Sequence, residues 1–409
     1  MQARPKPSLR LTPVTLGWAC IALCMALLAA YLATHRSEDP EWFGRYSQSY
    51  LLILILLTGA ALGAATVCLP RFGARWQEPM KNLLLFLVSM LVTLAATEAL
   101  VRATDPLGIS YYEASADYQR DKLADPDLGV RHRPSYSASY GGIASDFNEL
   151  GMRDRSMATR PDDEFRILAL GDSVTFGWGA AQSETFCEQL EVLLGQALRR
   201  PVSVLNTGVG GYNTVQELGI LRKLGSVLQP DLLLLTYTTN DHETFSGPVN
   251  PQSRATLEGK SPPEVIQLLL GRLWLYRLVY HVALYGNLGF SPGGTEDSAP
   301  RNAGWRDSMA SLGEIARAAT DAGVPLVVIF YRMSAQEAPR LLADVTAAVA
   351  PVPVVDSAAW FAGRDVLALT NSRVDPHPNG QGHAVLARGI ANYLLASGLI
   401  PPGAPDGLK

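Results

Sequence analysis

Ser173 lies where an apolar run ends abruptly in Gly-Asp-Ser, within the stretch RILALGDSVTFGWG. A serine hydroxyl is a poor nucleophile unless a base, usually histidine, lies within hydrogen-bond reach and is itself held by a third group. His377, in VDPHPNGQGH, is the candidate base, and Asp375 is the candidate group that fixes its tautomer and stabilises its charged form. These residue types predict nucleophilic attack on a carbonyl carbon. The structural alternative is that Ser173 only caps the next helix.

Such an attack develops an oxyanion, which needs fixed hydrogen-bond donors. The backbone N–H groups of Ser173 and Gly211 and the side-chain amide of Asn240 would supply three, and losing one such donor costs about 10²–10³ in rate. Glycine suits position 211 because a bare backbone lets the substrate approach closely. We expect Asp241 to brace its own turn. His242 either lines the cleft or lies in an exposed loop.

All of these residues follow runs that predict strands. The expected strands are Phe165–Leu170, Val202–Leu205, Asp231–Tyr237, Leu326–Tyr331 and Val352–Asp356, and helical patterns separate them at Thr185–Leu198, Val215–Leu224, Asp307–Ala322 and Gln336–Val349. Short, fully apolar strands that alternate with helices predict an α/β fold with a parallel sheet covered on both faces. Ligands of such sheets bind at the carboxyl ends of the strands, so the polar loops should meet there.

Four blocks of the chain resemble those of the SGNH, or GDSL, hydrolase family. They are GDSVTFGWG, NTGVGGYNT, TNDH and DPHPNGQGH, in the family's order, and the family's four letters map onto Ser173, Gly211, Asn240 and His377. The lead-in NELGMRDRS resembles the segment before the first block in many membrane-tethered bacterial members. The resemblance covers about residues 147–395. It implies a three-layer α/β/α parallel-sheet (flavodoxin-like) domain that acts on ester bonds through a serine, without a cofactor.

Two positions depart from the family's pattern. Thr238 stands where the third block usually has glycine, and one residue separates Asp375 from His377 where the family commonly has two. The G-x-S-x-G pattern of the α/β-hydrolase fold does not fit, because Thr175 occupies the position of its second glycine. We interpret His383, at the start of the last predicted helix, as a structural or capping residue.

Apolar residues make up 48% of the chain and are concentrated in three runs near its start, at about residues 14–33, 50–69 and 82–101. Each run, as a helix, is long enough to cross a hydrocarbon core of roughly 30 Å. We therefore expect three transmembrane helices and no cleaved signal, in preference to buried helices of a soluble domain. Glu98, the one charge inside the third run, is expected to pair with Arg102, one helical turn later.

Lysine and arginine in the short flanks indicate the orientation. The N-terminal tail and the loop before the third run carry three each (Arg4, Lys6, Arg10 and Arg71, Arg75, Lys81), whereas the first loop carries two (Arg36, Arg45). Positive residues favour the cytoplasmic side, so we expect the N-terminus inside and everything after about residue 102 outside. This predicts a multi-pass protein of the cytoplasmic (inner) membrane with a periplasmic catalytic domain.

The expected organisation is a membrane anchor over residues 1–104, a linker and lead-in over 105–161, and the hydrolase domain over 162–400. An insertion at about 243–302 contains a strongly apolar helical pattern near 262–290, which we interpret as core of the domain in preference to a membrane-surface element or a lid. Cys187 is the only cysteine of the soluble part, so neither an internal disulfide nor a cysteine metal cluster is expected.

Three functions fit these observations. The first is an outward-facing serine esterase that hydrolyses O-acyl carbohydrate or lipid of the cell envelope through an acyl-enzyme on Ser173. The second is an O-acyltransferase that passes the acyl group to an envelope or exported polysaccharide. The third is a non-catalytic binding or assembly protein, disfavoured because every catalytic position is filled. A net charge of -4 excludes a basic nucleic-acid binder. The sequence does not indicate an oligomeric state.

Overall fold

The computed structural model describes residues 13–34, 50–68, 74–105, 108–156, 160–161, 163–243, 273–285 and 302–400. The chain divides into two compact units. One comprises residues 1–109 and 259–288, and the other comprises residues 110–258 and 289–409.

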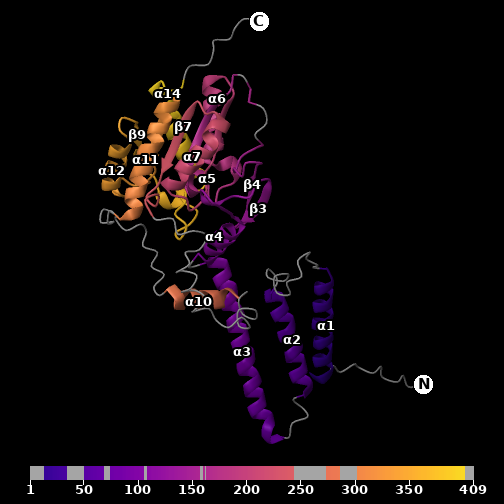
Figure 1. Ribbon diagram of the computed structural model, residues 1–409. Helices are drawn as coiled ribbons and strands as arrows, with labels where there is room; N and C mark the ends of the chain where they lie inside the picture. Colours follow the sequence, from indigo (N-terminus) through magenta and orange to yellow (C-terminus); the bar gives the residue numbers. More distant parts are fainter. Residues whose placement is uncertain are drawn as a thin grey trace, which may run out of the picture. The chain divides into compact units, whose positions relative to one another are not determined.

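The second unit is built on a five-stranded parallel sheet (Figure 1). Its strands are β5 (Phe165–Gly171), β6 (Val202–Asn206), β7 (Leu232–Tyr237), β8 (Leu326–Phe330) and β9 (Val354–Asp356), in the order β6-β5-β7-β8-β9. After β6 the chain crosses over β5 to form β7 on its other side. The loops that follow β5, β6 and β7 therefore leave three adjacent strands at the same edge of the sheet, which is where open α/β sheets bind ligands.

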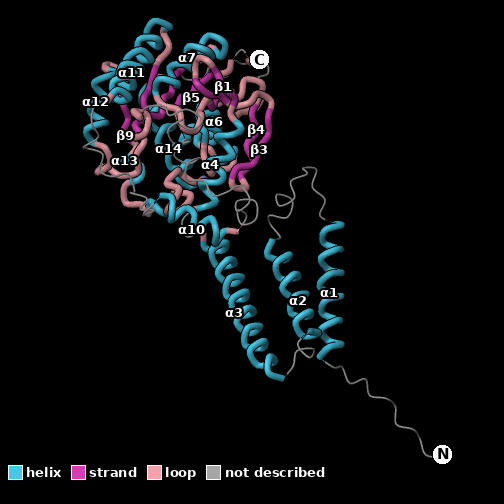
Figure 2. Tube along the Cα trace, turned by 60° about the horizontal axis from the view of Figure 1, so that its bottom comes forward, coloured by secondary structure: helices cyan, strands magenta, loops and turns pink. Residues whose placement is uncertain are grey.

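Helices cover both faces of this sheet (Figure 2). Leu168 of β5 belongs to a buried cluster with residues of α7 (Thr214–Leu228), α11 (Ala303–Ala322) and α12 (Pro339–Val349). Ile167, its neighbour in the strand, belongs to a second cluster with residues of α6 (Phe186–Leu198) and α14 (Gly380–Ser397). Successive side chains of a strand point to opposite faces, so the two clusters are separate layers. The predicted three-layer α/β/α fold is confirmed.

Short elements complete this unit. They are α5 (Ser173–Phe176), η3 (Gln182–Glu184), α13 (Ala358–Phe361) and η5 (Val366–Leu369). Where we expect a linker and lead-in, the structure has α4 (Ile109–Asp121) and two antiparallel hairpins, β1 (Leu123–Asp125) with β2 (Gly129–Arg131) and β3 (Tyr136–Tyr140) with β4 (Ile143–Phe147). Aromatic side chains hold them: Tyr118, Tyr140 and Phe147 form one buried cluster with Phe176 and Trp178, which follow Ser173. The domain limits of the sequence analysis remain a prediction.

The first unit contains α1 (Pro13–Thr34), α2 (Tyr50–Cys68), α3 (Ala74–Thr104) and α10 (Trp274–Tyr285). Helices thus occupy all three segments in which we expect membrane spans. Within the described residues, one helix, Glu78–Thr104, is long and apolar enough to cross a membrane, whereas Val14–Ala30 and Leu56–Ala65 are shorter apolar stretches. The helices therefore support a single candidate span, and the three-span topology remains a prediction.

Glu98 joins two helices of the first unit. Its carboxylate accepts hydrogen bonds from Arg102 Nε (2.7 Å), as expected, and also from the backbone N–H groups of Trp274 (3.0 Å) and Leu275 (2.8 Å) at the start of α10. A carboxylate at this position satisfies N–H groups that have no partner within the helix. The described part of the insertion therefore packs with α3 and not into the core of the sheet domain, which corrects our interpretation. Residues 244–272 and 286–301 of the insertion lie outside the described residues.

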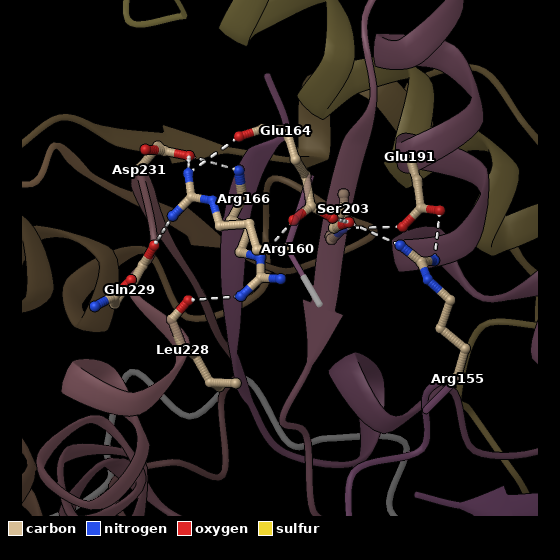
Figure 3. Close-up of polar contacts among 10 residues, drawn as sticks. Arg155, Arg160, Glu164, Arg166, Glu191, Ser203, Leu228, Gln229 and Asp231 are labelled. Carbon is tan, nitrogen blue, oxygen red and sulfur yellow. Dashed lines mark hydrogen bonds and ion pairs between the residues drawn. The ribbon is translucent and has the colours of Figure 1, made fainter. Parts of the chain in front are cut away.

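A polar network joins the amino ends of three strands in the sheet domain (Figure 3). Arg166 of β5 donates to Glu164 (2.6 Å), and its backbone N–H donates to Asp231, just before β7 (2.8 Å). Glu164 also accepts from the hydroxyl of Ser203 on β6. Both side chains of the Arg166–Glu164 pair are less than a tenth exposed, so each charge depends on the other for compensation.

We predict that Arg166→Met lowers the free energy of unfolding of the sheet domain by about 3 kcal/mol, because it leaves a buried carboxylate without its partner. Urea unfolding of the purified chain in detergent micelles measures this. Arg222→Met is the matched control, since the Arg222–Glu314 pair is 65% and 41% exposed and should contribute about 1 kcal/mol or less. Equal effects of the two variants would contradict the prediction.

Candidate active site

Ser173 is the first residue of α5, and Asp172 caps that helix. The Asp172 carboxylate accepts from the backbone N–H of Val174 (2.9 Å) and is 1% exposed. The capping role that Ser173 could have had is therefore filled by its neighbour, and the Ser173 hydroxyl is left for other contacts. Gly171 permits the turn, because a Cβ there would lie 2.1 Å from the Thr175 hydroxyl oxygen.

The Ser173 hydroxyl faces His377. Ser173 Oγ lies 2.8 Å from His377 Nε2, and His377 Nδ1 lies 2.5 Å from Asp375 Oδ1. Because the carboxylate accepts a hydrogen bond from the Nδ1–H of His377, Nε2 carries no hydrogen and is free to accept from the serine. Ser173 Oγ is also 3.1 Å from Asp172 Oδ2, so the single hydroxyl hydrogen has two possible acceptors.

The short spacing between Asp375 and His377 produces a compact loop. Asp375 Oδ1 accepts from the backbone N–H of His377 (3.2 Å) as well as from its ring, and Asp375 Oδ2 accepts from the amide of Asn371 (3.0 Å). The backbone N–H of Asn371 in turn donates to the carbonyl of His377 (3.0 Å). The Asp-Pro-His sequence therefore lets one carboxylate hold both the backbone and the ring of the histidine.

Asn240 is held at the site by two side chains. Its amide nitrogen donates to Asp172 Oδ2 (3.2 Å), and its amide oxygen accepts from the hydroxyl of Thr238 (2.7 Å). Thr238, which replaces the family's glycine, also has its hydroxyl 3.1 Å from Asp172 Oδ2. This departure from the family's pattern adds a polar group that ties the loop after β7 to the loop after β5.

Gly211 lies in the loop after β6 with a φ of +82°, a conformation that favours glycine. Within the described part of the chain, neither its backbone N–H nor that of Ser173 has a hydrogen-bond partner. The loop packs against α5: the backbone N–H of Val209 donates to the carbonyl of Gly171 (3.3 Å), and a Cβ on Gly208 would lie 2.2 Å from the nitrogen of Phe176. The structure thus brings Ser173, His377, Asp375 and Asn240 together by direct contacts and sets the Gly211 loop beside them.

Comparison with known families identifies the chain. The model of the GDSL-like lipase/acylhydrolase family matches residues 169–385, more than half of the sequence. The chain belongs to this family. It is an SGNH-type serine hydrolase that acts on ester bonds.

Similar solved structures include TesA (16% identity, covering 57% of this chain and 99% of that one, TM-score 0.36). A variant of Axe2, an acetyl-xylooligosaccharide esterase from Geobacillus, is 15% identical, with 56% and 93% coverage and a TM-score of 0.35. The psychrotrophic esterase EstA from Pseudoalteromonas is 14% identical, with 57% and 97% coverage and a TM-score of 0.34. No curated protein shows significant similarity to the hydrolase.

Two aromatic rings lie beside His377 that the sequence analysis missed. The ring centroids of Tyr111 on α4 and of Trp178 lie 6.2 and 6.4 Å from that of the imidazole, and the two aromatic rings meet edge to face at 6.3 Å. Nothing in the sequence pointed to Tyr111. The hydrophobic pattern around it has neither helical nor strand periodicity, so it predicts no element near the site. The lead-in thus supplies part of the wall of the site.

The remaining histidines of the hydrolase domain have other surroundings. His383 is fully buried, and its Nδ1 accepts from the backbone N–H of Phe186 at the start of α6 (3.2 Å). Burial lowers the pKa of His383 to about 3, so it stays neutral. His242 is buried as well.

In the described ranges, no group of three or more His, Cys, Asp or Glu side chains is arranged to hold a metal ion.

Two further buried carboxyls, Asp241 and Glu217, interact electrostatically with Asp172, and the sequence analysis singled out only Asp241. Asp241 is fully buried; it accepts from the backbone N–H of Thr238 (2.6 Å), and its Oδ1 lies 3.0 Å from the Thr238 hydroxyl oxygen. Glu217, in the first turn of α7, is 1% exposed, and neither of its carboxyl oxygens has a partner among the described residues. Burial, and then the nearby charge of Asp172, raise the pKa of Glu217 well above its ordinary value of 4.5. Burial and the neighbouring carboxyls Glu217 and Asp172 raise the pKa of Asp241 as well. Because Asp241 has a hydrogen-bond donor and Glu217 has none among the described residues, we assign the neutral state to Glu217.

We predict that Glu217→Gln stabilises the fold at neutral pH and not at acid pH. Above the ordinary pKa of 4.5 the unfolded chain ionises this carboxyl while the folded chain keeps its proton, so stability falls as the pH rises. The thermal midpoint of the variant should equal that of the wild type near pH 4 and exceed it increasingly toward pH 8. Asp321→Asn, which alters an exposed carboxyl, is the control. A difference between Glu217→Gln and the wild type that does not change with pH would refute the assignment.

Proposed function

We propose that this hydrolase is a membrane-anchored serine esterase in which Ser173 is the nucleophile, His377 the general base and Asp375 the group that orients the base. The observation that carries the proposal is the continuous chain of contacts from Ser173 Oγ to His377 Nε2 (2.8 Å) and from His377 Nδ1 to Asp375 (2.5 Å). This is the arrangement that activates a serine hydroxyl at neutral pH.

The reaction proceeds in two halves. Ser173 Oγ attacks the carbonyl carbon of the ester while its proton passes to His377 Nε2, and the tetrahedral oxyanion forms. When the oxyanion collapses, the C–O bond to the alcohol breaks and His377 returns the proton to the leaving oxygen, which leaves an acyl-enzyme on Ser173. Water then attacks the acyl carbon, again losing its proton to His377. The acid departs, and His377 returns the proton to Ser173 Oγ.

Three donors stabilise the oxyanion in this proposal: the backbone N–H groups of Ser173 and Gly211 and the side-chain amide of Asn240. The absence of hydrogen-bond partners for both backbone groups among the described residues supports this role. The amide nitrogen of Asn240 has two hydrogens, of which Asp172 receives one. The other hydrogen is left for the substrate, and the contact with Asp172 holds the amide in a single orientation.

We propose that α3 anchors the enzyme in the cytoplasmic membrane. Four of its apolar side chains, Leu85, Phe86, Val92 and Leu100, are between 62% and 66% exposed, as lipid-facing residues are. Arg71, Arg75 and Lys81 lie near the start of this helix in sequence, which favours its amino end in the cytoplasm and the catalytic domain outside. In this proposal α1 and α2 add two further spans, and the orientation does not depend on them.

The proposed substrate is an O-acyl ester of a cell-envelope carbohydrate or lipid. In sequence, only residues 105–108 separate α3 from α4, and α4 contributes Tyr111 to the wall beside His377. An enzyme on so short a tether would meet esters of the envelope more readily than soluble ones. The same acyl-enzyme would serve an O-acyltransferase if a sugar hydroxyl replaced water in the second half of the reaction.

Turnover of an aryl acetate by the purified full chain in detergent micelles tests the proposal. The wild type should release one acetate for each phenol, and Ser173→Ala should lose activity by at least about 10³-fold, because no other group can form the acyl-enzyme. Repeating the assay with a soluble oligosaccharide acceptor measures how the acyl group divides between water and sugar.

Retention of activity by a folded Ser173→Ala variant would exclude Ser173 as the nucleophile. Phenol release that exceeds acetate release in the presence of the oligosaccharide would favour the acyltransferase over the esterase. Ser183→Ala, which alters an exposed serine on η3, is the matched control and should retain full activity.

The proposed orientation predicts which positions a membrane-impermeant maleimide can label in intact cells. In a background without the native cysteines, Arg364→Cys on the exposed surface of the catalytic domain should react in intact cells. Glu78→Cys, near the amino end of α3, should react only after permeabilisation. The reverse pattern would place the catalytic domain in the cytoplasm.

A further inference from the structure

The peptide unit between Gly210 and Gly211 is held from the lead-in. The backbone N–H of Gly210 donates to the hydroxyl oxygen of Tyr118 on α4 (2.8 Å), and the ammonium group of Lys122, which follows α4, donates to the Gly210 carbonyl. This carbonyl belongs to the same peptide unit as the N–H of Gly211. A cation therefore lies at the oxygen end of the peptide whose N–H end is a proposed donor to the oxyanion.

Lys122 is unusual among lysines in its surroundings. It is only 9% exposed, and its ammonium group lies 4.3 Å from the centroid of the Tyr118 ring and donates to Gln119 Oε1 (3.0 Å). No carboxylate in the described part of the chain forms an ion pair with it. Burying a cation without a counter-ion is costly, so the charge is directed at the dipoles that remain, chiefly the Gly210 carbonyl.

We propose that Lys122 is a positioning residue that polarises the Gly210–Gly211 peptide and so strengthens the Gly211 N–H as a donor to the oxyanion. A charge-assisted hydrogen bond to the carbonyl withdraws electron density from the amide, and hydrogen bonds in a chain strengthen one another in a low-dielectric interior. Tyr118 binds the N–H of the preceding Val209–Gly210 peptide, so Gly210 is held through both its N–H and its carbonyl. The inference rests on the proposed function, because it takes the Gly211 N–H to face the oxyanion.

The role of the Lys122 charge can be tested by varying the pH, because the titratable groups near it do not change charge near neutral pH. The titratable groups near Lys122 and the adjoining Tyr118 are Tyr118 itself on α4, His132 after β2, Arg153 before β5 and Tyr212 in the loop after β6. The Tyr118 hydroxyl donates to His132 Nε2 (2.6 Å), and His132 Nδ1 donates to the carbonyl of Gly151 (3.0 Å). Burial raises the pKa of both tyrosines and lowers that of His132 to about 3, so these three stay neutral across the neutral range. Tyr140 on β3 also packs on Tyr118, and burial raises its pKa, so it stays neutral as well.

Lys122 and Arg153 carry the positive charge of this group. Burial lowers the pKa of Arg153 to about 10 and that of Lys122 to about 7, so Lys122 alone among these groups changes charge near neutral pH. A neutral amine can still donate a hydrogen bond to the Gly210 carbonyl. Loss of the proton therefore removes the polarisation while the structural contact stays, and a pH profile separates the two roles.

The test measures kcat and KM for an aryl acetate between about pH 6 and pH 9, with the full chain in detergent micelles. The variants are Lys122→Met, which removes the charge, and Lys122→Arg, which keeps it throughout this range. Arg317→Met, which removes an exposed cation of α11, is the matched control. The wild type should lose kcat with an apparent pKa near 7 as the pH rises, with little change in KM. Lys122→Met should have a kcat about tenfold lower at pH 6 without this alkaline loss, and Lys122→Arg should keep its activity to higher pH.

Two results would overturn the inference. One is a loss of kcat at alkaline pH that is the same in Lys122→Arg as in the wild type. The other is a Lys122→Met variant that keeps the wild-type kcat. Labelling by a fluorophosphonate probe separates these results from failure of the proposed function. Complete labelling of Ser173 in both the wild type and Lys122→Met shows that the nucleophile is intact, whereas absence of labelling in the wild type refutes the proposed function itself.

Discussion

The buried carboxylate of Asp172 holds the two loops that carry the serine and the asparagine. It caps α5 through the N–H of Val174 and accepts from the Asn240 amide, and its Oδ2 lies 3.1 Å from the hydroxyl oxygens of both Ser173 and Thr238. A carboxylate that is 1% exposed must have such donors, because burying it without them would cost several kcal/mol. The same requirement explains the neutral state of Glu217. Its carboxyl has no hydrogen-bond donor among the described residues, so a negative charge on it would not be compensated.

The strand order makes this contact possible. β5 lies between β6 and β7, so the loops that follow these three strands leave adjacent positions at one edge of the sheet. At the other edge, the network of Arg166, Glu164 and Asp231 joins the amino ends of the same strands. The strands thus separate these ion pairs from the groups proposed to react. Substitutions at one end of the strands should therefore leave the charges at the other end undisturbed.

The lead-in is part of the active-site region as well as a connection to the first unit. Its aromatic side chains pack on the residues that follow Ser173, Tyr111 lies beside His377, and Tyr118 and Lys122 bind the N–H and the carbonyl of Gly210. Residues at the end of α4, which are remote in sequence from the second block, thereby hold the loop of that block. A family comparison over residues 169–385 does not include them, although they contact the residues that the comparison identifies.

The sequence by itself determined the strand positions, the α/β class and the residues at the ends of the strands, because apolar runs and glycine-rich turns are local patterns. It also indicated apolar helices near the start of the chain, of which only the one at Glu78–Thr104 is long enough in the described residues to support a span. Tertiary structure alone decided that Asp172 and not Ser173 caps α5, that Thr238 ties two loops together, and that α10 packs with α3 through Glu98. It also decided the contacts of Tyr111 with His377 and of Tyr118 and Lys122 with Gly210. Apart from the local Asp172 cap, each of these depends on a contact between segments far apart in the chain, and such contacts leave no periodicity or motif in the sequence around either partner.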